Sequence, residues 1–185
     1  IHWVGTSMGG LIGTALAGLP DTPVTRLVLN DVGPVITGES LRRIGQYVGT
    51  DPTWGSFEEA LTYVRTVSAP FGPLTDLQWR HLTETSVSRR ADGRWGFLYD
   101  PAIAQAFKLA FAAVDIDLWP MYEAVRCPTL AVRGAESDLL RRDTWLEMAE
   151  RGPKARLAEI PGVGHAPMFM DDGQIAVVKE FLLAA

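Results

Sequence analysis

The sequence predicts an α/β fold, in which a parallel sheet alternates with helices and carries one helical insertion. Three observations predict it: short strand-like runs separated by helical stretches, a glycine-rich turn directly after the first run, and a long middle region with helical patterns only. The strand-like runs cover residues 1–5, 25–30, 129–133 and 155–160. The stretches between them are long enough for crossover helices, which indicates parallel βα units.

The first strand leads straight into Gly5-Thr6-Ser7-Met8-Gly9, a Gly-x-Ser-x-Gly pattern. In a strand–turn–helix context this pattern is typical of a nucleophile elbow, whose tight turn requires small residues two positions before and two after the serine. Such a turn exposes the serine hydroxyl above the next helix N-terminus, where backbone N–H groups favour a developing negative charge. The small residues of 8–18 predict that helix, and Ser7 is the predicted nucleophile.

The middle of the chain changes to helical patterns only. The signals that start helices are Ser56-x-x-Glu59, Thr75-x-x-Gln78 and Asp100-Pro101. The first two are capping boxes, and the third is an N-cap followed by a first-turn proline. We therefore expect a core made of residues 1–33 and 119–185, with a helical insertion at 34–118. The many aromatic residues of the insertion are expected to form mostly its own core.

A serine nucleophile needs a general base, and the chain offers three histidines. His2 lies inside the first strand and His81 inside a predicted helix, so both are interpreted as structural or surface residues. His165 lies in a loop directly after the strand at 155–160. A histidine there can reach a serine at the carboxyl end of a neighbouring strand, so His165 is the predicted base.

Two aspartates compete for the acid that orients this base. Asp138 follows the strand at 129–133, and Asp31 ends the strand at 25–30. Carboxylates at strand ends often cap the next turn, and this interpretation is favoured for Asp31. Glu136 is a weaker third candidate. The chain order Ser…Asp…His fits Asp138, which is the predicted acid, with Asp31 as the alternative.

These features resemble the α/β-hydrolase superfamily, in particular its cap-bearing members. The resemblance rests on segments 5–9, 27–34 (Leu-Val-Leu-Asn-Asp-Val-Gly-Pro), 133–138 (Arg-Gly-Ala-Glu-Ser-Asp) and 162–167 (Gly-Val-Gly-His-Ala-Pro). It implies an α/β-hydrolase fold with a partial parallel sheet, the last four strands, and a helical cap at 34–118. It also implies Ser7 as nucleophile, Asp138 as acid, His165 as base and the Met8 backbone N–H as one oxyanion-hole donor. A serine nucleophile disfavours haloalkane dehalogenases and epoxide hydrolases, which need a carboxylate.

The same resemblance implies that part of the fold lies outside this sequence. In that superfamily the elbow follows the fifth of eight strands, whereas here it follows the first. The missing part would include the loop with the second oxyanion donor, whose loss typically costs about 10²–10³ in rate. We therefore expect a fragment of a longer protein, or one completed by another chain as in a homo-oligomer, with weak or no activity alone.

The resemblance implies a serine hydrolase that cleaves a small or medium, mainly apolar ester through an acyl-enzyme. Carbon–carbon bond hydrolases, lactonases, thioesterases and perhydrolases share the superfamily and remain alternatives. A third reading is a ligand-binding protein without turnover, or a catalytically incomplete fragment. An intact Ser-His-Asp set favours the enzyme.

Composition excludes several other classes. The net charge is −5 with both signs interspersed, which does not indicate nucleic-acid binding. One cysteine, Cys127, excludes an intrachain disulfide, and three scattered histidines offer no zinc spacing. No apolar run approaches the ~20 residues that span a membrane. We expect a small apolar substrate, no cofactor, no metal, no nucleic-acid or membrane partner, and a cytoplasmic location.

Overall fold

The computed structural model describes residues 1–105 and 114–184, and its contacts divide the chain into two compact units. Unit 1 comprises Ile1–Thr37, Pro70–Gly72 and Asp115–Ala185, and unit 2 comprises Gly38–Ala69 and Pro73–Val114. The insertion expected at 34–118 is therefore slightly shorter. Its two ends belong to unit 1, where β3 (Val35–Ile36) and β7 (Ile116–Asp117) pair antiparallel with each other.

Unit 1 contains a four-stranded parallel sheet in the order β1-β2-β8-β9. The strands are β1 (His2–Thr6), β2 (Arg26–Asn30), β8 (Thr129–Gly134) and β9 (Arg156–Ile160). All four predicted strands are confirmed. Thr6 is opposite Asn30, Asn30 is opposite Val132, and Val132 is opposite Ala158. The carboxyl ends of the four strands therefore meet at one edge of the sheet.

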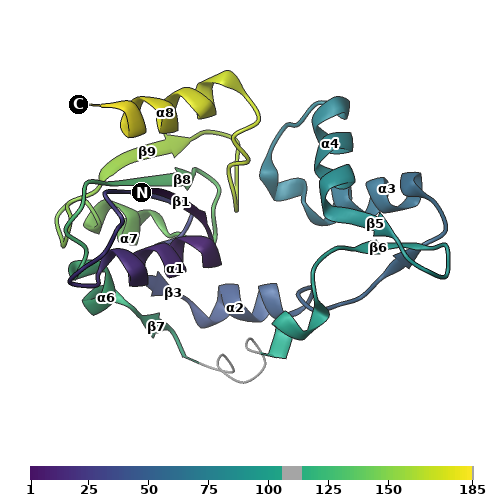
Figure 1. The fold of residues 1–185 in the computed structure, drawn as a ribbon, viewed down its shortest axis with the longest axis horizontal. Coiled ribbons are helices and arrows are strands. Elements are labelled where there is room, and N and C mark those ends of the chain that lie inside the picture. Colours follow the sequence, from purple (N-terminus) through teal and green to yellow (C-terminus); the bar gives the residue numbers. More distant parts are fainter. Residues whose placement is uncertain (106–113, 185) are drawn as a thin grey trace. The chain divides into compact units, whose positions relative to one another are not determined.

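Helices cover both faces of this sheet (Figure 1). On one face, Phe181 of α8 (Asp172–Leu183) packs with Val28, Leu130 and Val132. On the other lies α1 (Met8–Ala17), followed along the chain by α6 (Trp119–Glu123) and α7 (Arg142–Glu147). The middle residues of β2 and β8 are buried on both faces, which explains why their sequences are continuously apolar rather than alternating.

The small residues of α1 allow this helix to lie close to the sheet. A Cβ at position 13 would overlap the ring of Trp3, and one at position 10 would overlap the side chain of Val32. The Trp3 indole N–H donates to the carbonyl of Gly9 at 2.9 Å. Bulkier residues at these positions would push α1 off β1, so the small-residue helix expected from the sequence has a packing cause.

Unit 2 contains helices and a small sheet, so the expectation of helices only is wrong. Its elements are α2 (Gly38–Gly45), β4 (Thr53–Trp54), α3 (Phe57–Val67), α4 (Asp76–Ser86), β5 (Val87–Arg89) and β6 (Trp95–Phe97), with the 3₁₀ turn η2 (Pro101–Ile103). Between α3 and α4, the 3₁₀ turn η1 (Ala69–Phe71) lies mostly in the short segment that belongs to unit 1. The strands form an antiparallel sheet in the order β4-β6-β5. Strands of two or three residues are too short to show an alternating pattern. The remainder of the helix expected after Asp100 falls at 106–113, outside the described residues.

Aromatic side chains form a core between this small sheet and α3. Trp54 lies 5.1 Å from Tyr63 and 5.1 Å from Phe97, measured between ring centroids, and Phe57 lies 5.4 Å from Trp95. The tilted and edge-to-face angles are those that aromatic pairs prefer. Most of these aromatics therefore pack against one another within unit 2, as the sequence predicts.

Two predicted helix starts in unit 2 are confirmed. The Ser56 side chain accepts from the backbone N–H of Glu59 at 3.2 Å. At the start of α4, the Thr75 hydroxyl accepts from the Gln78 N–H at 3.3 Å, and the Gln78 side chain accepts from the Thr75 N–H at 2.8 Å. Thr75 and Gln78 thus satisfy two N–H groups that the helix itself leaves unpaired.

Replacing Thr75 by alanine should lower the free energy of unfolding of unit 2 by about 1 kcal/mol, because the first turn of α4 loses its cap. Thr85→Ala is the matched control on the same helix. Its exposed hydroxyl only bonds back to the His81 and Leu82 carbonyls within α4, so its removal should be neutral. Urea unfolding followed by tryptophan fluorescence measures both. Equal effects of the two changes would contradict the capping role.

Candidate active site

Ser7 is the single residue between β1 and α1, and its backbone is held in an unusual conformation. Its φ is 51° and its ψ is −121°. The Ser7 N–H donates to the Asn30 carbonyl at 3.1 Å, and the Ser7 carbonyl accepts from the Gly10 N–H at 2.9 Å. A non-glycine residue adopts such a positive φ only where its surroundings enforce it, and such residues concentrate at functional sites. The sharp strand-to-helix turn expected from the sequence is present.

The glycines around Ser7 have unequal roles. A Cβ at position 5 would overlap the carbonyl of Gly9, and a Cβ at position 10 would overlap Val32. At position 9, no described atom lies within 4 Å of an added Cβ. Within the described structure, the turn therefore requires glycine at 5 and 10, and the expectation that position 9 must lack bulk is not supported.

Asp31 and His165 form a close pair at the edge where Ser7 lies. Asp31 is the residue after β2, and its side chain is fully buried. Its Oδ2 lies 2.7 Å from Nδ1 of His165, whose side chain is 13% exposed. An ionised carboxylate can only accept, so Nδ1 carries the proton and Nε2 is left as the acceptor nitrogen of the neutral ring. This is the tautomer that a general base needs.

The pairing with His165 expected of Asp138 is thus made by Asp31. Asp138 is exposed in the loop after β8, whereas its neighbour Ser137 is buried and points toward Asp31. The expectation that Asp31 caps its own turn is wrong as well. Its carboxylate accepts from residues more than 100 positions away in the sequence. The direction of side chains in one loop decides which aspartate meets the histidine.

Two further donors complete the surroundings of the Asp31 carboxylate. Oδ1 accepts from the backbone N–H of Gly134 at 2.8 Å, and Oδ2 accepts from the Ser137 hydroxyl at 2.6 Å. The Asp31 backbone has a φ of 54°, which aspartate tolerates better than most residues, and its N–H donates to the Val132 carbonyl at 2.8 Å. The buried charge is therefore surrounded by donors from two other segments of unit 1.

Asn30 links the strand before Ser7 to the loop after His165. Its side-chain Nδ2 donates to the Thr6 hydroxyl at 3.0 Å and to the Pro167 carbonyl at 2.8 Å. Asn30 is completely buried, and its Oδ1 has no hydrogen-bond partner among the described residues. Sequence reasoning missed both Asn30 and Ser137. For Asn30, the available signal was a polar residue at the end of a buried, otherwise apolar strand. Ser137 lies in the loop after β8, where no comparable local pattern marks it.

The histidine loop is anchored from two sides. The Gly164 N–H donates to the Pro70 carbonyl at 2.7 Å, and the Glu136 N–H donates to the Val163 carbonyl at 2.9 Å. A Cβ at position 134 would overlap the carbonyl of Gly164, so the end of β8 lies directly against this loop. Pro70 belongs to a short segment that the sequence places inside the insertion but that packs with unit 1. No local pattern indicated that contact.

Met8 follows Ser7 as the first residue of α1. The N–H groups of a first helical turn have no partner within the helix, and the positive end of the helix dipole lies there. The Met8 N–H therefore has the position that an oxyanion donor needs, and its role stays a prediction.

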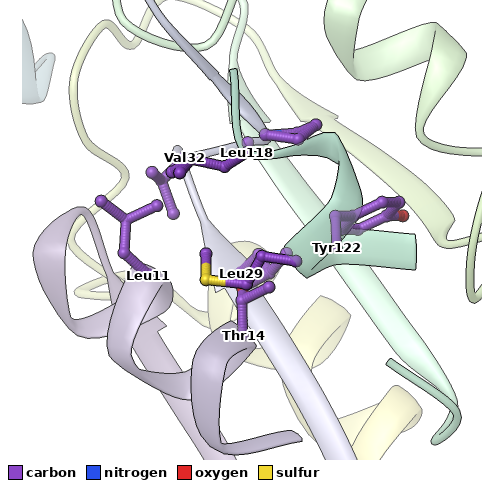
Figure 2. A pocket seen from close by; sticks show the side chains of 9 residues that line it. Leu11, Thr14, Leu29, Val32, Leu118 and Tyr122 are labelled. Atoms are coloured by element: carbon purple, nitrogen blue, oxygen red, sulfur yellow. The ribbon is translucent and has the colours of Figure 1, made fainter. Parts of the chain in front are cut away.

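Unit 1 also contains a small cavity of about 10 Å³, roughly the space of one water (Figure 2). Its lining comes from α1, the end of β2 and α6: Leu11, Thr14, Leu29, Val32, Gly33, Pro34, Leu118, Met121 and Tyr122. None of Ser7, Asp31 and His165 lines it, so this cavity is separate from the candidate active site.

Neither a metal-binding cluster nor a membrane-spanning helix occurs in the part of the chain that the structure describes. Across 1–105 and 114–184, no three histidine, cysteine, aspartate or glutamate side chains gather to hold a metal ion. In the same ranges, no helix combines the length and the apolar character needed to cross a membrane.

The comparisons with known proteins agree on the family to which this chain is similar. The model of the Alpha/beta hydrolase family matches residues 1–179. A 3-hydroxybutyrate-oligomer hydrolase of Cupriavidus necator is 47% identical over 192 residues, an alignment that covers 100% of this chain and 66% of that protein. This chain therefore spans slightly less than two thirds of the length of that relative.

Solved structures agree on the fold. A protein from Rickettsia typhi has a TM-score of 0.87 at 30% identity, covering 97% of this chain and 61% of that one. An alpha/beta hydrolase from Novosphingobium aromaticivorans has a TM-score of 0.85 at 34% identity, covering 97% of this chain and 64% of that one.

Gly5→Ala should lower the free energy of unfolding by about 1–3 kcal/mol, because the new methyl group overlaps the backbone of α1. Gly9→Ala, in the same motif, should change it by less than about 1 kcal/mol, since the added Cβ meets no described atom. Thermal or urea unfolding of the 185-residue chain compares the two. A larger loss at Gly9 than at Gly5 would contradict this account of the turn.

Proposed function

This chain belongs to the alpha/beta hydrolase family, and from its site we propose that it carries the nucleophile, base and acid of a serine ester hydrolase. The observation that carries the proposal is the 2.7 Å pair of Asp31 and His165 at the sheet edge where Ser7 leaves β1. Ser7, His165 and Asp31 are then the triad, with Asp31 in the place expected of Asp138.

The chemistry follows from the tautomer of His165. Nε2 takes the proton of the Ser7 hydroxyl while Oγ attacks the ester carbonyl carbon. Asp31 stabilises the imidazolium that forms and keeps the ring in its orientation. The Met8 N–H donates to the oxyanion of the tetrahedral intermediate. The imidazolium then protonates the departing alkoxide, which leaves an acyl group on Ser7.

Water completes the cycle. His165 removes a proton from a water molecule, and the resulting hydroxide attacks the acyl carbonyl. The second tetrahedral intermediate collapses, the acid is released, and the proton returns from His165 to Ser7. A second oxyanion donor would come from outside this chain, in agreement with its span of 66% of the relative's length.

The proposed substrate is a short ester of a 3-hydroxy acid. Support comes from the Cupriavidus necator relative, named a 3-hydroxybutyrate-oligomer hydrolase, at 47% identity along the whole of this chain. Such oligomers consist of oxygen esters with small apolar side groups, which fits the small or medium, mainly apolar substrate expected from the sequence. Unit 2 is proposed to act as the cap that selects this substrate and excludes water.

Ser7→Ala should abolish ester hydrolysis, with a loss on the order of 10⁶ in kcat where a triad acts as a unit. Release of 3-hydroxybutyrate from its dimer and trimer, measured on the full-length protein, checks this. Labelling of Ser7 by a fluorophosphonate probe should disappear in the same variant. Hydrolysis at the parental rate by a folded Ser7→Ala protein would contradict the proposal.

Asp31→Asn should lower kcat by about 10³–10⁴, because an amide in place of the carboxylate favours the wrong imidazole tautomer and cannot stabilise the imidazolium. Asp138→Asn is the matched comparison, and its exposed side chain should make the loss much smaller. Steady-state kinetics on the same ester measures both. A larger loss of kcat in Asp138→Asn than in Asp31→Asn would identify Asp138, in the loop after β8, as the acid.

A further inference from the structure

We propose that Ser137 is a positioning residue for the triad: its hydroxyl holds the Asp31 carboxylate in the rotamer that meets His165. The inference rests on the proposed function for its kinetic consequences and on the hydrogen-bond geometry for its structural part. Ser137 lies in the loop after β8 and was not among the residues singled out from the sequence.

The hydroxyl of Ser137 makes three hydrogen bonds, and their directions are determined. The backbone N–H groups of Leu139 and Leu140 point to Ser137 Oγ at 3.2 Å and 3.1 Å, so Oγ is the acceptor in both. The single hydroxyl proton is therefore left for Asp31 Oδ2, 2.6 Å away. Capping the turn at 139–140 needs only the lone pairs of Oγ. The hydroxyl proton is not needed for this cap and is donated to the Asp31 carboxylate instead.

Ser137 and His165 share one carboxylate oxygen. Asp31 Oδ2 accepts from both, while Oδ1 accepts from the Gly134 N–H. A carboxylate with one donor on each oxygen could still rotate about the Cβ–Cγ bond and exchange them. The Ser137 hydroxyl is the one side-chain donor to Asp31 besides His165 among the described hydrogen bonds, and it favours the orientation in which Oδ2 faces the imidazole.

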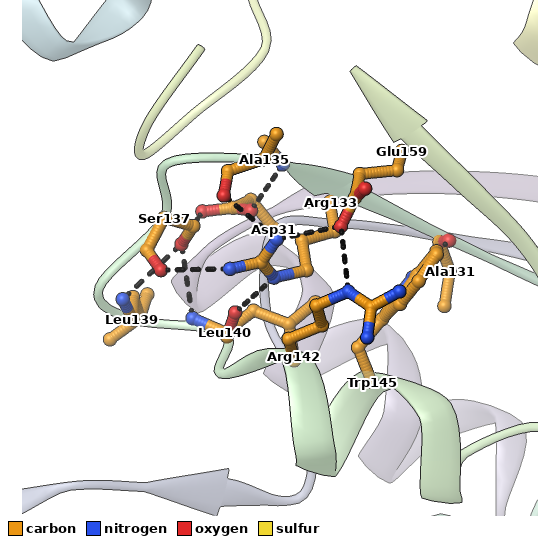
Figure 3. A network of polar contacts seen from close by, with 11 residues as sticks. Asp31, Ala131, Arg133, Ala135, Ser137, Leu139, Leu140, Arg142, Trp145 and Glu159 are labelled. Carbon is orange, nitrogen blue, oxygen red and sulfur yellow. Dashed lines mark hydrogen bonds and ion pairs between the residues drawn. The ribbon is translucent and has the colours of Figure 1, made fainter. Parts of the chain in front are cut away.

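A buried arginine holds the Ser137 loop in place (Figure 3). Arg133 is only 5% exposed. Its Nη2 donates to the Ser137 carbonyl at 3.2 Å, its Nε to the Leu140 carbonyl at 2.7 Å, and its Nη1 to the Ala135 carbonyl at 3.0 Å. Nη1 also forms an ion pair with Glu159 of β9 at 2.8 Å.

This arrangement makes the loop rigid for an energetic reason. A buried guanidinium without acceptors is costly, so loosening the loop would leave the donors of Arg133 unpaired. The loop from Ala135 to Leu140 therefore has one favoured conformation, in which Ser137 points inward and Asp138 outward. A rigid second layer of this kind is what keeps a reacting group in its productive geometry.

The kinetic test compares Ser137→Ala with Ser137→Thr, which keeps a hydroxyl at the same Cβ. Removing a hydrogen bond to a charged group predicts a fall in kcat of about 10- to 100-fold for Ser137→Ala, with KM nearly unchanged. Ser137→Thr should restore kcat to within a few-fold of the parent. A kcat within twofold of the parent for Ser137→Ala would overturn the proposal.

A double-mutant cycle distinguishes positioning from a general structural role. If Ser137 acts through Asp31, adding Ser137→Ala to Asp31→Asn should cost no further activity. Independent losses that multiply in the double variant would overturn the proposal. Melting temperatures establish that each variant is folded. If Ser137→Ala does not fold, Ser137→Cys takes its place, because it has a similar shape and a weak donor, and the same criteria apply.

A further test of Ser137 uses proton NMR and does not depend on turnover. The proton on His165 Nδ1, hydrogen-bonded to Asp31, should give a low-field proton NMR resonance, identified by its loss in His165→Gln. We expect the resonance to persist in Ser137→Thr and to shift or vanish in folded Ser137→Ala. An unchanged resonance in that variant would overturn the positioning role. If the parent protein hydrolyses no ester, the proposed function fails, and this NMR test alone decides the role of Ser137.

Discussion

The buried carboxylate of Asp31 is the constraint on which the rest of the site depends. A charge with no exposed surface must be surrounded by donors, because its transfer out of water is otherwise too costly. The donors come from the end of β8, from the loop that follows it, and from the loop after β9. Two other chain segments, the end of β8 with its following loop and the loop after β9, must therefore meet around the Asp31 side chain, and that meeting places the imidazole beside the sheet edge where Ser7 lies.

The parallel sheet makes this meeting possible. Its register aligns Thr6, Asn30, Val132 and Ala158 across four strands, so the residues that follow them leave the sheet side by side. Close backbone approach then depends on glycine at positions where a Cβ would collide, as at Gly5 with α1 and at Gly134 with the histidine loop. The buried side chain of Asn30 connects the end of β1, directly before Ser7, to the loop that carries His165.

Unit 2 shows where local patterns stop being informative. The capping residues of α3 and α4 act within three positions of each other, so the sequence predicts both helix starts correctly. In the β4-β6-β5 sheet, β5 and β6 are neighbours along the chain, but β4 pairs with the distant β6, where Thr53 and Trp54 lie opposite Gly96 and Trp95, and Trp54 packs on Phe97. Its strands have two or three residues each, which is too few for a periodic signal.

The sequence by itself determined the four core strands, the turn that carries Ser7, and the position of His165 after the last strand. Each depends on local chemistry: apolar runs, small residues at a tight turn, and a histidine in a loop at a strand end. Only the tertiary structure decided the acid. Asp31 and Asp138 both follow strands, and their sequence contexts do not separate them. The guanidinium of Arg133 donates hydrogen bonds to carbonyls of the loop after β8 and so fixes its conformation. In this conformation Ser137 points inward and Asp138 outward, and Asp31 is the carboxylate that meets the imidazole.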